Sequence, residues 1–312
     1  MAAEIISVRA ADGTSLAVGS YPGERGGPVT LIMHGIASHM GWYHGLAEAL
    51  QADGVTVYMP DRRGVALSGG TPGHTNRWRT LEDDLSRIAS EIEHRHPRRP
   101  IHAIGISLGG VMTLASSILR PGLFRSQILL SPALAAAVTF PPLRRIEIFW
   151  RALSAPRKLY DLPFGVKDLT DNLDWQNALF EESKRSQVSA RFLLETLQMQ
   201  RFVRNQIKHV DAPILALFGE RDLVVDNETS IEILGRSGSA LVRVEVFESM
   251  SHILAASVPK QELIGRLVSW LRGNWGSAKE RFTVLKTVLV KRDDHVMFMP
   301  LASKKDGTEE AR

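Results

Sequence analysis

Short apolar runs alternate with amphipathic segments through the first half of the chain. In the amphipathic segments apolar residues recur at three- and four-residue spacing, which is the spacing along one face of a helix. The alternation of strands and helices predicts a mostly parallel sheet flanked by helices, with right-handed crossovers. The predicted strands are Glu4–Arg9, Ser15–Ser20, Val29–His34, Val55–Pro60, Ile101–Ile106 and Gln127–Leu130, and the predicted helices are Trp42–Gln51, Leu81–Arg95 and Gly109–Leu119.

The alternation stops after Leu130. Residues 135–210 carry helical patterns and many aromatic side chains without a convincing strand, which predicts a helical lid inserted into the α/β domain. The sheet pattern then resumes with predicted strands at Pro213–Gly219 and Leu241–Phe247, and with predicted helices near Ser230–Leu234 and at Lys260–Arg272.

We therefore predict one domain with an insertion rather than two tandem domains. Residues 1–134 and 211–276 form the core, residues 135–210 form the lid, and residues 277–312 form a C-terminal extension. The runs Thr283–Val290 and Val296–Leu301 are compatible with a hairpin in this extension, and the polar residues from Ser303 onward predict a disordered tail.

Composition places the chain among ordinary globular proteins, with 44% hydrophobic and 23% charged residues. The net charge is only +4, and the basic residues occur in short clusters rather than along one face, so we expect no nucleic-acid binding. The basic clusters leave open a weak, peripheral contact with anionic membranes. The sequence does not indicate an oligomeric state.

The absence of cysteine excludes thiol nucleophiles, thiolate metal sites and disulfides, so covalent chemistry must use an oxygen or nitrogen nucleophile. The N-terminus has no basic segment followed by an apolar run, and no apolar stretch reaches the ~20 residues of a spanning helix. We therefore expect a cytoplasmic location without stable membrane insertion.

A nucleophile is predicted at Ser107, within Gly105-Ile106-Ser107-Leu108-Gly109. A G-x-S-x-G pattern can arise by chance, so its context must decide. An apolar predicted strand precedes Ser107 and a predicted helix follows it, as a sharp strand-to-helix turn that exposes a reactive serine requires. Small residues at the second position on either side allow the close backbone approach of such a turn.

A general base should lie at the carboxyl end of a strand, where ligands meet an open α/β sheet. Of ten histidines, His252 follows the last predicted strand and has this placement. His209 precedes a strand, His102 is at the start of one, and His295 is in the extension. We therefore predict His252 as the base.

The acid that orients the base should follow a strand at the same edge. Asp222 lies three residues after Gly219, and Asp226 is a rival four residues further on. The alternative role of either aspartate is to cap the following helix.

These residues together resemble the α/β-hydrolase superfamily, and within it the serine aminopeptidase and monoacylglycerol lipase-like group, over about residues 5–273. The motifs that carry the resemblance are His34-Gly35-Ile36, Asp61-Arg62-Arg63-Gly64, the Ser107 turn, Gly219-Glu220-Arg221-Asp222 and Ser251-His252, and their serine, aspartate, histidine order is that of the superfamily.

The resemblance favours Asp222 as the acid, at the end of a Gly-x-x-Asp pattern. It also implies an oxyanion hole formed by the backbone N–H groups of Ile36 and Leu108. His34 is expected to brace the Ile36 loop by hydrogen bonds. The family often has a glycine where Ala66 stands, so the backbone of this loop is expected to differ.

His34, His39 and His44 recur at five-residue spacing, which invites a metal site. This spacing does not align ligands on one helix face, and no carboxylate cluster accompanies it, so we predict neither a metal nor a cofactor.

The expected reaction is hydrolysis of a carboxylic ester through an acyl-enzyme, with a small acyl substrate such as a monoacylglycerol or lysophospholipid. Thioesterase and amidase activities remain open, as does an aminopeptidase that pairs a substrate amine with Glu181, Glu182 or Glu195. A non-catalytic homologue that binds a ligand in the same cleft is a further alternative. Dehalogenase and epoxide hydrolase chemistry is disfavoured because an aspartate would be expected in place of Ser107.

Overall fold

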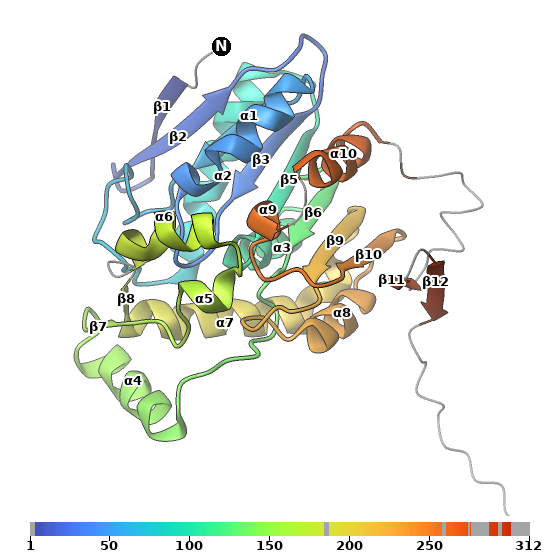
Figure 1. Ribbon diagram of the computed structural model, residues 1–312. Helices are drawn as coiled ribbons and strands as arrows, with labels where there is room; N and C mark the ends of the chain where they lie inside the picture. The colour runs from blue at the N-terminus through green and yellow to red at the C-terminus, as the bar shows by residue number, and fades with distance from the viewer. Residues whose placement is uncertain are drawn as a thin grey trace, which may run out of the picture.

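A mostly parallel sheet forms the centre of the protein (Figure 1). The computed structural model describes residues 4–183, 187–257, 260–273, 275, 287–292 and 295–300. The strand order is β1-β2-β4-β3-β5-β6-β9-β10-β11-β12, with parallel pairing from β4 through β11, which confirms the predicted class of fold. The strands are β1 (Glu4–Arg9), β2 (Ser15–Tyr21), β3 (Val29–Met33), β4 (Thr56–Pro60), β5 (Ile101–Ile106), β6 (Gln127–Leu130), β9 (Ile214–Gly219), β10 (Val242–Phe247), β11 (Thr287–Arg292) and β12 (His295–Pro300).

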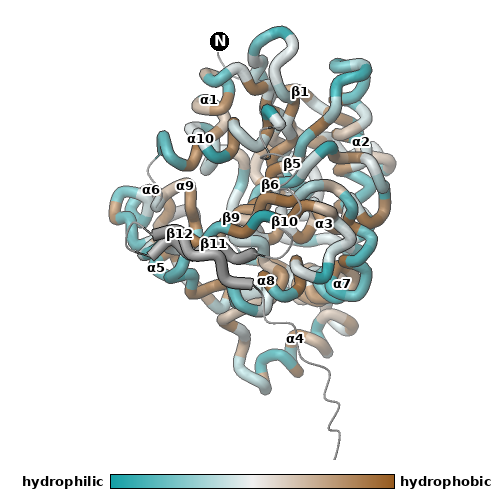
Figure 2. Tube along the Cα trace, turned by 90° about the vertical axis from the view of Figure 1, so that its right-hand side faces the viewer, coloured by the Kyte–Doolittle hydropathy of each residue, from teal (hydrophilic) through white to brown (hydrophobic). Residues whose placement is uncertain are grey.

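Helices cover both faces of the sheet. Successive side chains of a central strand point to opposite faces, so they pack into two different hydrophobic cores. Leu215 and Leu217 of β9 pack with α1 (His44–Ala52) and α10 (Lys260–Leu271). Ala216 and Phe218 pack with α3 (Leu108–Leu119) and α8 (Asn227–Gly235). Figure 2 shows hydrophobic residues concentrated along β6 and β9, enclosed by the helices.

The remaining helix of the first half, α2 (Trp78–Arg95), packs through Leu85, Ile88 and Ile92 against β2, β3 and β5. It begins three residues before the predicted start. The predicted helix at Trp42–Gln51 is divided, since a 3-10 turn at Met40–Tyr43 precedes α1.

The segment between β6 and β9 contains α4 (Pro142–Ser154), α5 (Val166–Leu169), α6 (Leu173–Ser183) and α7 (Ala190–Gln206). In Figure 1, α7 runs beneath the sheet and α4 lies at the outer end of the segment. The expectation of no strand here was wrong, since β7 (Leu159–Tyr160) and β8 (Val188–Ser189) pair antiparallel. Two residues are too few to leave an alternating pattern in a sequence.

In the C-terminal extension, β11 continues the sheet parallel to β10, and β12 pairs with β11 antiparallel. The predicted tail from Ser303 lies outside the described residues. Among the helices of the described residues, none combines the length and apolarity needed to cross a bilayer.

Candidate functional site

Ser107 occupies a strained turn between β5 and α3. Its φ is 54° and its ψ is −115°, a conformation that costs a non-glycine residue about 1–3 kcal/mol. Hydrogen bonds hold the turn, because Ser107 N donates to Leu130 O at 2.9 Å and Ala133 N donates to Ser107 O at 3.1 Å. The serine is 7% exposed.

The two glycines of the motif permit this turn. A Cβ on Gly109 would lie 2.1 Å from the carbonyl oxygen of Met33, and one on Gly105 would lie 2.5 Å from Thr113 Oγ1. The first clash is with backbone of β3, which cannot move without displacing the sheet. The loop after β3 also packs against the turn, since a Cβ on Gly35 would lie 3.3 Å from Ser107 Cβ.

His252 and Asp222 are joined across loops that follow neighbouring strands. His252 Nδ1 lies 2.7 Å from Asp222 Oδ2, and both side chains are buried. The other carboxylate oxygen of Asp222, Oδ1, accepts hydrogen bonds from the N–H groups of Val224 and Val225, at 2.8 and 2.9 Å. Burial raises the pKa of Asp222, but the hydrogen bond and charge of His252, together with the two amides, outweigh it and lower that pKa.

The loops can meet because Gly219 has no side chain. A Cβ there would lie 2.3 Å from Ser251 O and 2.4 Å from Met250 O. Asp226, the rival acid, instead caps α8, where its Oδ1 accepts from Thr229 N at 3.0 Å. The structure therefore brings Asp222, and not Asp226, to His252.

Other histidines considered as the base or as metal ligands lie elsewhere in the fold. His102 Nδ1 contacts Ser126 Oγ at 2.8 Å on the sheet, His39 Nδ1 accepts from Gly41 N, and His44 contacts Tyr21 and Glu48. His209 ends a 3-10 turn before β9, and His295 begins β12. Within the described ranges, no three His, Asp or Glu side chains are grouped as a metal site would require.

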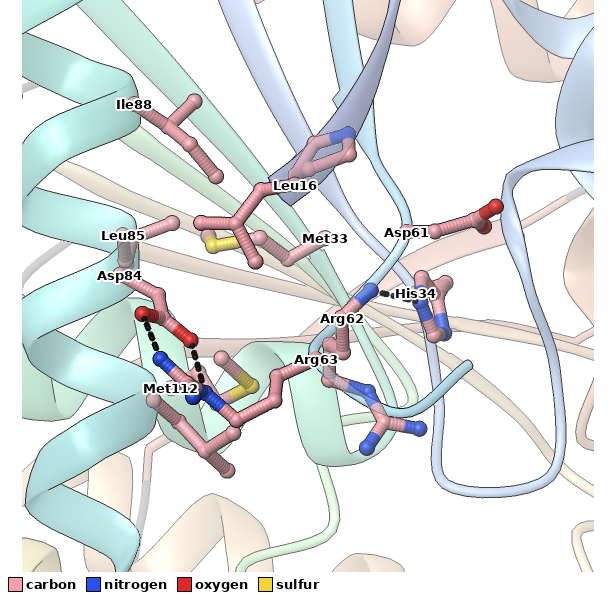
Figure 3. A pocket seen from close by; sticks show the side chains of 12 residues that line it. Leu16, Met33, His34, Asp61, Arg62, Arg63, Asp84, Leu85, Ile88 and Met112 are labelled. Atoms are coloured by element: carbon pink, nitrogen blue, oxygen red, sulfur yellow. Dashed lines mark hydrogen bonds and ion pairs between the residues drawn. The ribbon is translucent and has the colours of Figure 1, made fainter. Parts of the chain in front are cut away.

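His34 braces the loop after β3. Its Nε2 accepts a hydrogen bond from Arg62 N at 3.1 Å (Figure 3). The proton of the ring is therefore on Nδ1, which donates to Gly35 O at 2.9 Å. Burial, with the charge of Arg62, holds the pKa of His34 well below its usual value, and the ring is neutral. The sequence indicated His34 but not the role of Arg62, whose contacts depend on the fold.

Asp61 ties together the loops after β3 and β4. Its Oδ1 accepts from Met40 N at 2.8 Å and its Oδ2 accepts from Leu67 N at 3.0 Å. In the loop after β4, Ala66 has a φ of 43° at the position where the family pattern has glycine. The loop therefore keeps a left-handed residue there, at the cost of some backbone strain.

A cavity of about 450 Å³ opens beside these loops. Ile36, Trp42 and Arg62 line it from the core, and Val188 and Phe192 line it from the segment between β6 and β9. No aspartate or glutamate is among the described residues that line it.

A parallel sheet with a serine turn after β5, and with an aspartate and a histidine after β9 and β10, defines an α/β-hydrolase. The chain belongs to the family described as serine aminopeptidase, S33, whose model matches residues 27–256. The matched residues include the serine turn, Asp222 and His252.

Individual relatives are lipases. The monoacylglycerol lipase of Mycolicibacterium smegmatis is 22% identical over 255 residues, which cover 78% of this chain and 87% of that protein. The monoglyceride lipase of Homo sapiens is 24% identical over 245 residues, which cover 75% and 79%.

Solved structures of similar proteins share the fold. The crystal structure of the Paleococcus ferrophilus monoacylglycerol lipase matches with a TM-score of 0.74 and 22% identity, covering 83% of this chain and 98% of that one. A soluble variant of the Saccharomyces cerevisiae monoglyceride lipase, in complex with a substrate analogue, matches with a TM-score of 0.75 and 18% identity, covering 89% and 96%. The comparisons place the chain among the carboxylic-ester hydrolases of this superfamily.

Proposed function

We propose that the protein hydrolyses the ester of a monoacylglycerol, a lysophospholipid or a similar acyl ester through a Ser107–His252–Asp222 triad. The observation that carries this proposal is the 2.7 Å contact between His252 Nδ1 and Asp222 Oδ2, at the edge of the sheet where the strained Ser107 turn lies. A carboxylate on Nδ1 keeps the proton there, so Nε2 is free to act as a base.

The proposed reaction has two steps. His252 Nε2 takes the proton of Ser107 Oγ while that oxygen attacks the ester carbonyl, and the N–H groups of Ile36 and Leu108 stabilise the oxyanion. His252 then gives the proton to the leaving alcohol, and an acyl group remains on Ser107. Water, deprotonated by the same histidine, releases the acid and restores the serine.

A fluorophosphonate probe, which reacts with activated serines, tests the proposal directly. We expect the native protein to be labelled and S107A to remain unlabelled. The matched control is S117A on α3, whose hydroxyl is buried away from the turn and should leave labelling unchanged. Labelling that persists in S107A, or a native protein that is not labelled, would remove the enzymatic proposal in favour of a ligand-binding homologue.

Ester cleavage is favoured over aminopeptidase activity by the charges near the site. Glu195 is one of the three carboxylates that an aminopeptidase could use to pair a substrate amine. It accepts from Trp78 N at 2.9 Å and pairs with Arg191 at 2.7 Å, and its side chain is 3% exposed. The side chains of Glu181 and Glu182 lie outside the described residues. The described residues that line the cavity beside Ile36 include two arginines and no carboxylate, so they do not attract an ammonium.

A series of p-nitrophenyl esters of increasing acyl length, run beside an amino-acyl arylamide and an acyl thioester, separates the alternatives. We expect the highest kcat/KM on an ester of a medium or long acyl chain. Faster cleavage of the arylamide would favour an aminopeptidase, and faster cleavage of the thioester would favour a thioesterase.

We propose residues 135–210 as the lid that selects the acyl chain. Val188 and Phe192 already contribute to the cavity wall, and Gln200 Nε2 donates to Ala133 O at 2.6 Å, next to the serine turn. The lid thus contacts both the cavity and the segment that holds Ser107.

Helix α4 supports a peripheral contact with an anionic lipid surface. Five large apolar side chains on it are about half to four-fifths exposed, namely Leu143, Ile146, Phe149, Trp150 and Leu153. The same helix carries three arginines and one glutamate. An exposed apolar stripe with basic neighbours is the pattern of a helix that lies in a membrane interface, where the acyl substrate would be found.

A further inference from the structure

Arg62 is nearly buried beside the proposed oxyanion hole, and the reaction as described does not use it. We propose that Arg62 is a positioning residue, whose guanidinium fixes the direction of the Ile36 N–H toward the oxyanion formed at Ser107. This inference rests on the proposed function, because it concerns the rate of the proposed acyl transfer.

The first step of the argument is the geometry of one peptide unit. The carbonyl of Gly35 and the N–H of Ile36 belong to the same planar, trans unit, so they point in opposite directions. Arg62 Nη2 donates to Gly35 O at 2.8 Å. The Ile36 N–H is therefore turned away from the arginine, and the Ser107 side chain lies against Gly35.

A second bond fixes the next unit. The same Nη2 donates to Ile36 O at 2.9 Å, so that two successive carbonyls are held by one nitrogen. His34 Nδ1 also donates to Gly35 O, and its Nε2 accepts from the backbone N–H of Arg62. The loop after β3 and the residue after Asp61 thus form one closed network, in which rotation of the Gly35–Ile36 unit would break two bonds to side chains.

The burial of Arg62 is hard to explain by stability alone. Within the described part of the chain, no carboxylate lies at ion-pair distance from its guanidinium, and Nε has no hydrogen-bond partner there. Burial lowers the pKa of Arg62 to about 10, and the nearby charge of Asp61 opposes this. A buried cation without an ion pair is costly, whereas an apolar side chain of similar size would pack without that cost.

The other side of the guanidinium faces the insertion. The ring of Phe192, on α7, lies 5.5 Å from the Arg62 guanidinium carbon, and both residues line the 450 Å³ cavity. The arginine is therefore held between the proposed lid and the loop that it orients. A substitution of Arg62 should weaken stabilisation of the transition state more than binding of the ester.

The test compares R62Q, R62K and R120Q with the native protein on one p-nitrophenyl ester. We expect R62Q to lower kcat about 10- to 100-fold, with KM changed less than about threefold, because one oxyanion donor is misdirected rather than removed. R62K keeps the charge and offers a single donor nitrogen in place of the planar guanidinium, so its kcat should be intermediate. R120Q is the matched control, since its guanidinium donates to Ser86 O, beyond the end of α3 farthest from Ser107, and its kcat should stay within about threefold.

A tetrahedral mimic gives a readout that a purely structural role would not move. We expect the affinity of R62Q for an alkyl trifluoromethyl ketone to fall by about the same factor as kcat. The affinity for the fatty acid product should be retained. If R62Q does not fold, R62K carries the same comparison.

A native enzyme that hydrolyses the ester, with R62Q or R62K of unchanged kcat and unchanged affinity for the ketone, would overturn the positioning role. Failure of the proposed function looks different, because the native protein itself would then not react with a fluorophosphonate.

Discussion

Asp222 presents its two carboxylate oxygens to different partners, Oδ2 to the imidazole of His252 and Oδ1 to two backbone amides. The amides fix which oxygen faces the histidine. The carboxylate therefore sets the tautomer of the ring as well as its orientation.

Replacing Asp222 by asparagine should reverse that tautomer. The side-chain oxygen of asparagine must face the amides of Val224 and Val225, which leaves its NH₂ group to donate to His252 Nδ1. Nε2 then carries the proton and cannot accept one from Ser107. We expect D222N to lower kcat about 10³- to 10⁴-fold in steady-state ester hydrolysis.

D226N is the control for this variant. Asparagine caps a helix about as well as aspartate, so D226N should keep kcat within about threefold and leave Tm unchanged. A larger loss of kcat in D226N than in D222N would show that Asp226, and not Asp222, is the acid.

Alanine at Gly109 should damage the serine turn. The added Cβ would lie 2.1 Å from Met33 O, so β3 and α3 must separate. We expect a loss of about 3 kcal/mol or more in the free energy of unfolding, or failure to fold, measured by urea denaturation. G45A in α1 is the counterpart, because no atom lies within 4 Å of its Cβ, and it should stabilise the protein by about 0.5–1 kcal/mol. Equal effects of the two substitutions would contradict this account of the turn.

Glu82 should make stability fall as pH rises through neutrality. Its side chain is buried on α2, Oε2 accepts from Ser116 Oγ, and burial raises its pKa from 4.5 to about 8. Between these two values the folded protein holds a proton that the unfolded chain has released. The free energy of unfolding should therefore decrease by up to about 1.4 kcal/mol per pH unit in this window and level off above it.

Urea denaturation at pH 5, 6.5 and 8 measures the slope. E82Q should flatten it and make the protein more stable than the native one at pH 8. E93Q, which alters an exposed carboxylate on the same helix, should keep the native slope. An E82Q protein with an unchanged slope would show that Glu82 is ionised in the fold.

The exposed face of α4 should bind anionic vesicles. We expect the native protein to sediment with vesicles of phosphatidylcholine and phosphatidylglycerol more than with phosphatidylcholine alone. The double variant L143S/W150S should weaken this at least about 10-fold, because it removes two apolar side chains from the interface. I5S, on the edge strand β1, is the control for loss of an exposed apolar side chain. A dimer in solution that L143S/W150S dissociates, without any vesicle binding, would assign the face to a second copy instead.

Much of the core could be predicted from local patterns. Strands β3, β4, β5, β6 and β9 are mostly apolar because they are buried on both faces, and the serine turn has its glycines in the immediate neighbourhood of Ser107. The placement of Asp222 and His252 after successive strands followed from the position of those strands in the chain. In each case the signal lies within a few residues of the feature.

Features that depend on contacts between distant segments were missed. Nothing near Arg62 in the sequence indicates that its guanidinium contacts Gly35 and Ile36, which lie 27 and 26 residues earlier in the chain. Nor does it indicate the contact with the ring of Phe192. Likewise the sequence left Glu195 open as a partner for a substrate amine, whereas the fold directs it to Trp78 and Arg191. Helical periodicity identifies a buried face without saying what lies opposite.

The chain leaves the sheet at the end of β6 and returns to it at β9, and these two strands are hydrogen-bonded neighbours, with Gln127 opposite Ile214. A segment of different size or shape can therefore be accommodated between them without a change in strand order, in the Ser107 turn or in the pairing of Asp222 with His252. Preference for a substrate and the ability to cleave it are in this sense separable properties of the molecule. Chimeras that exchange this segment with that of a relative should retain the chemistry, and Phe192 is the contact that such an exchange has to preserve.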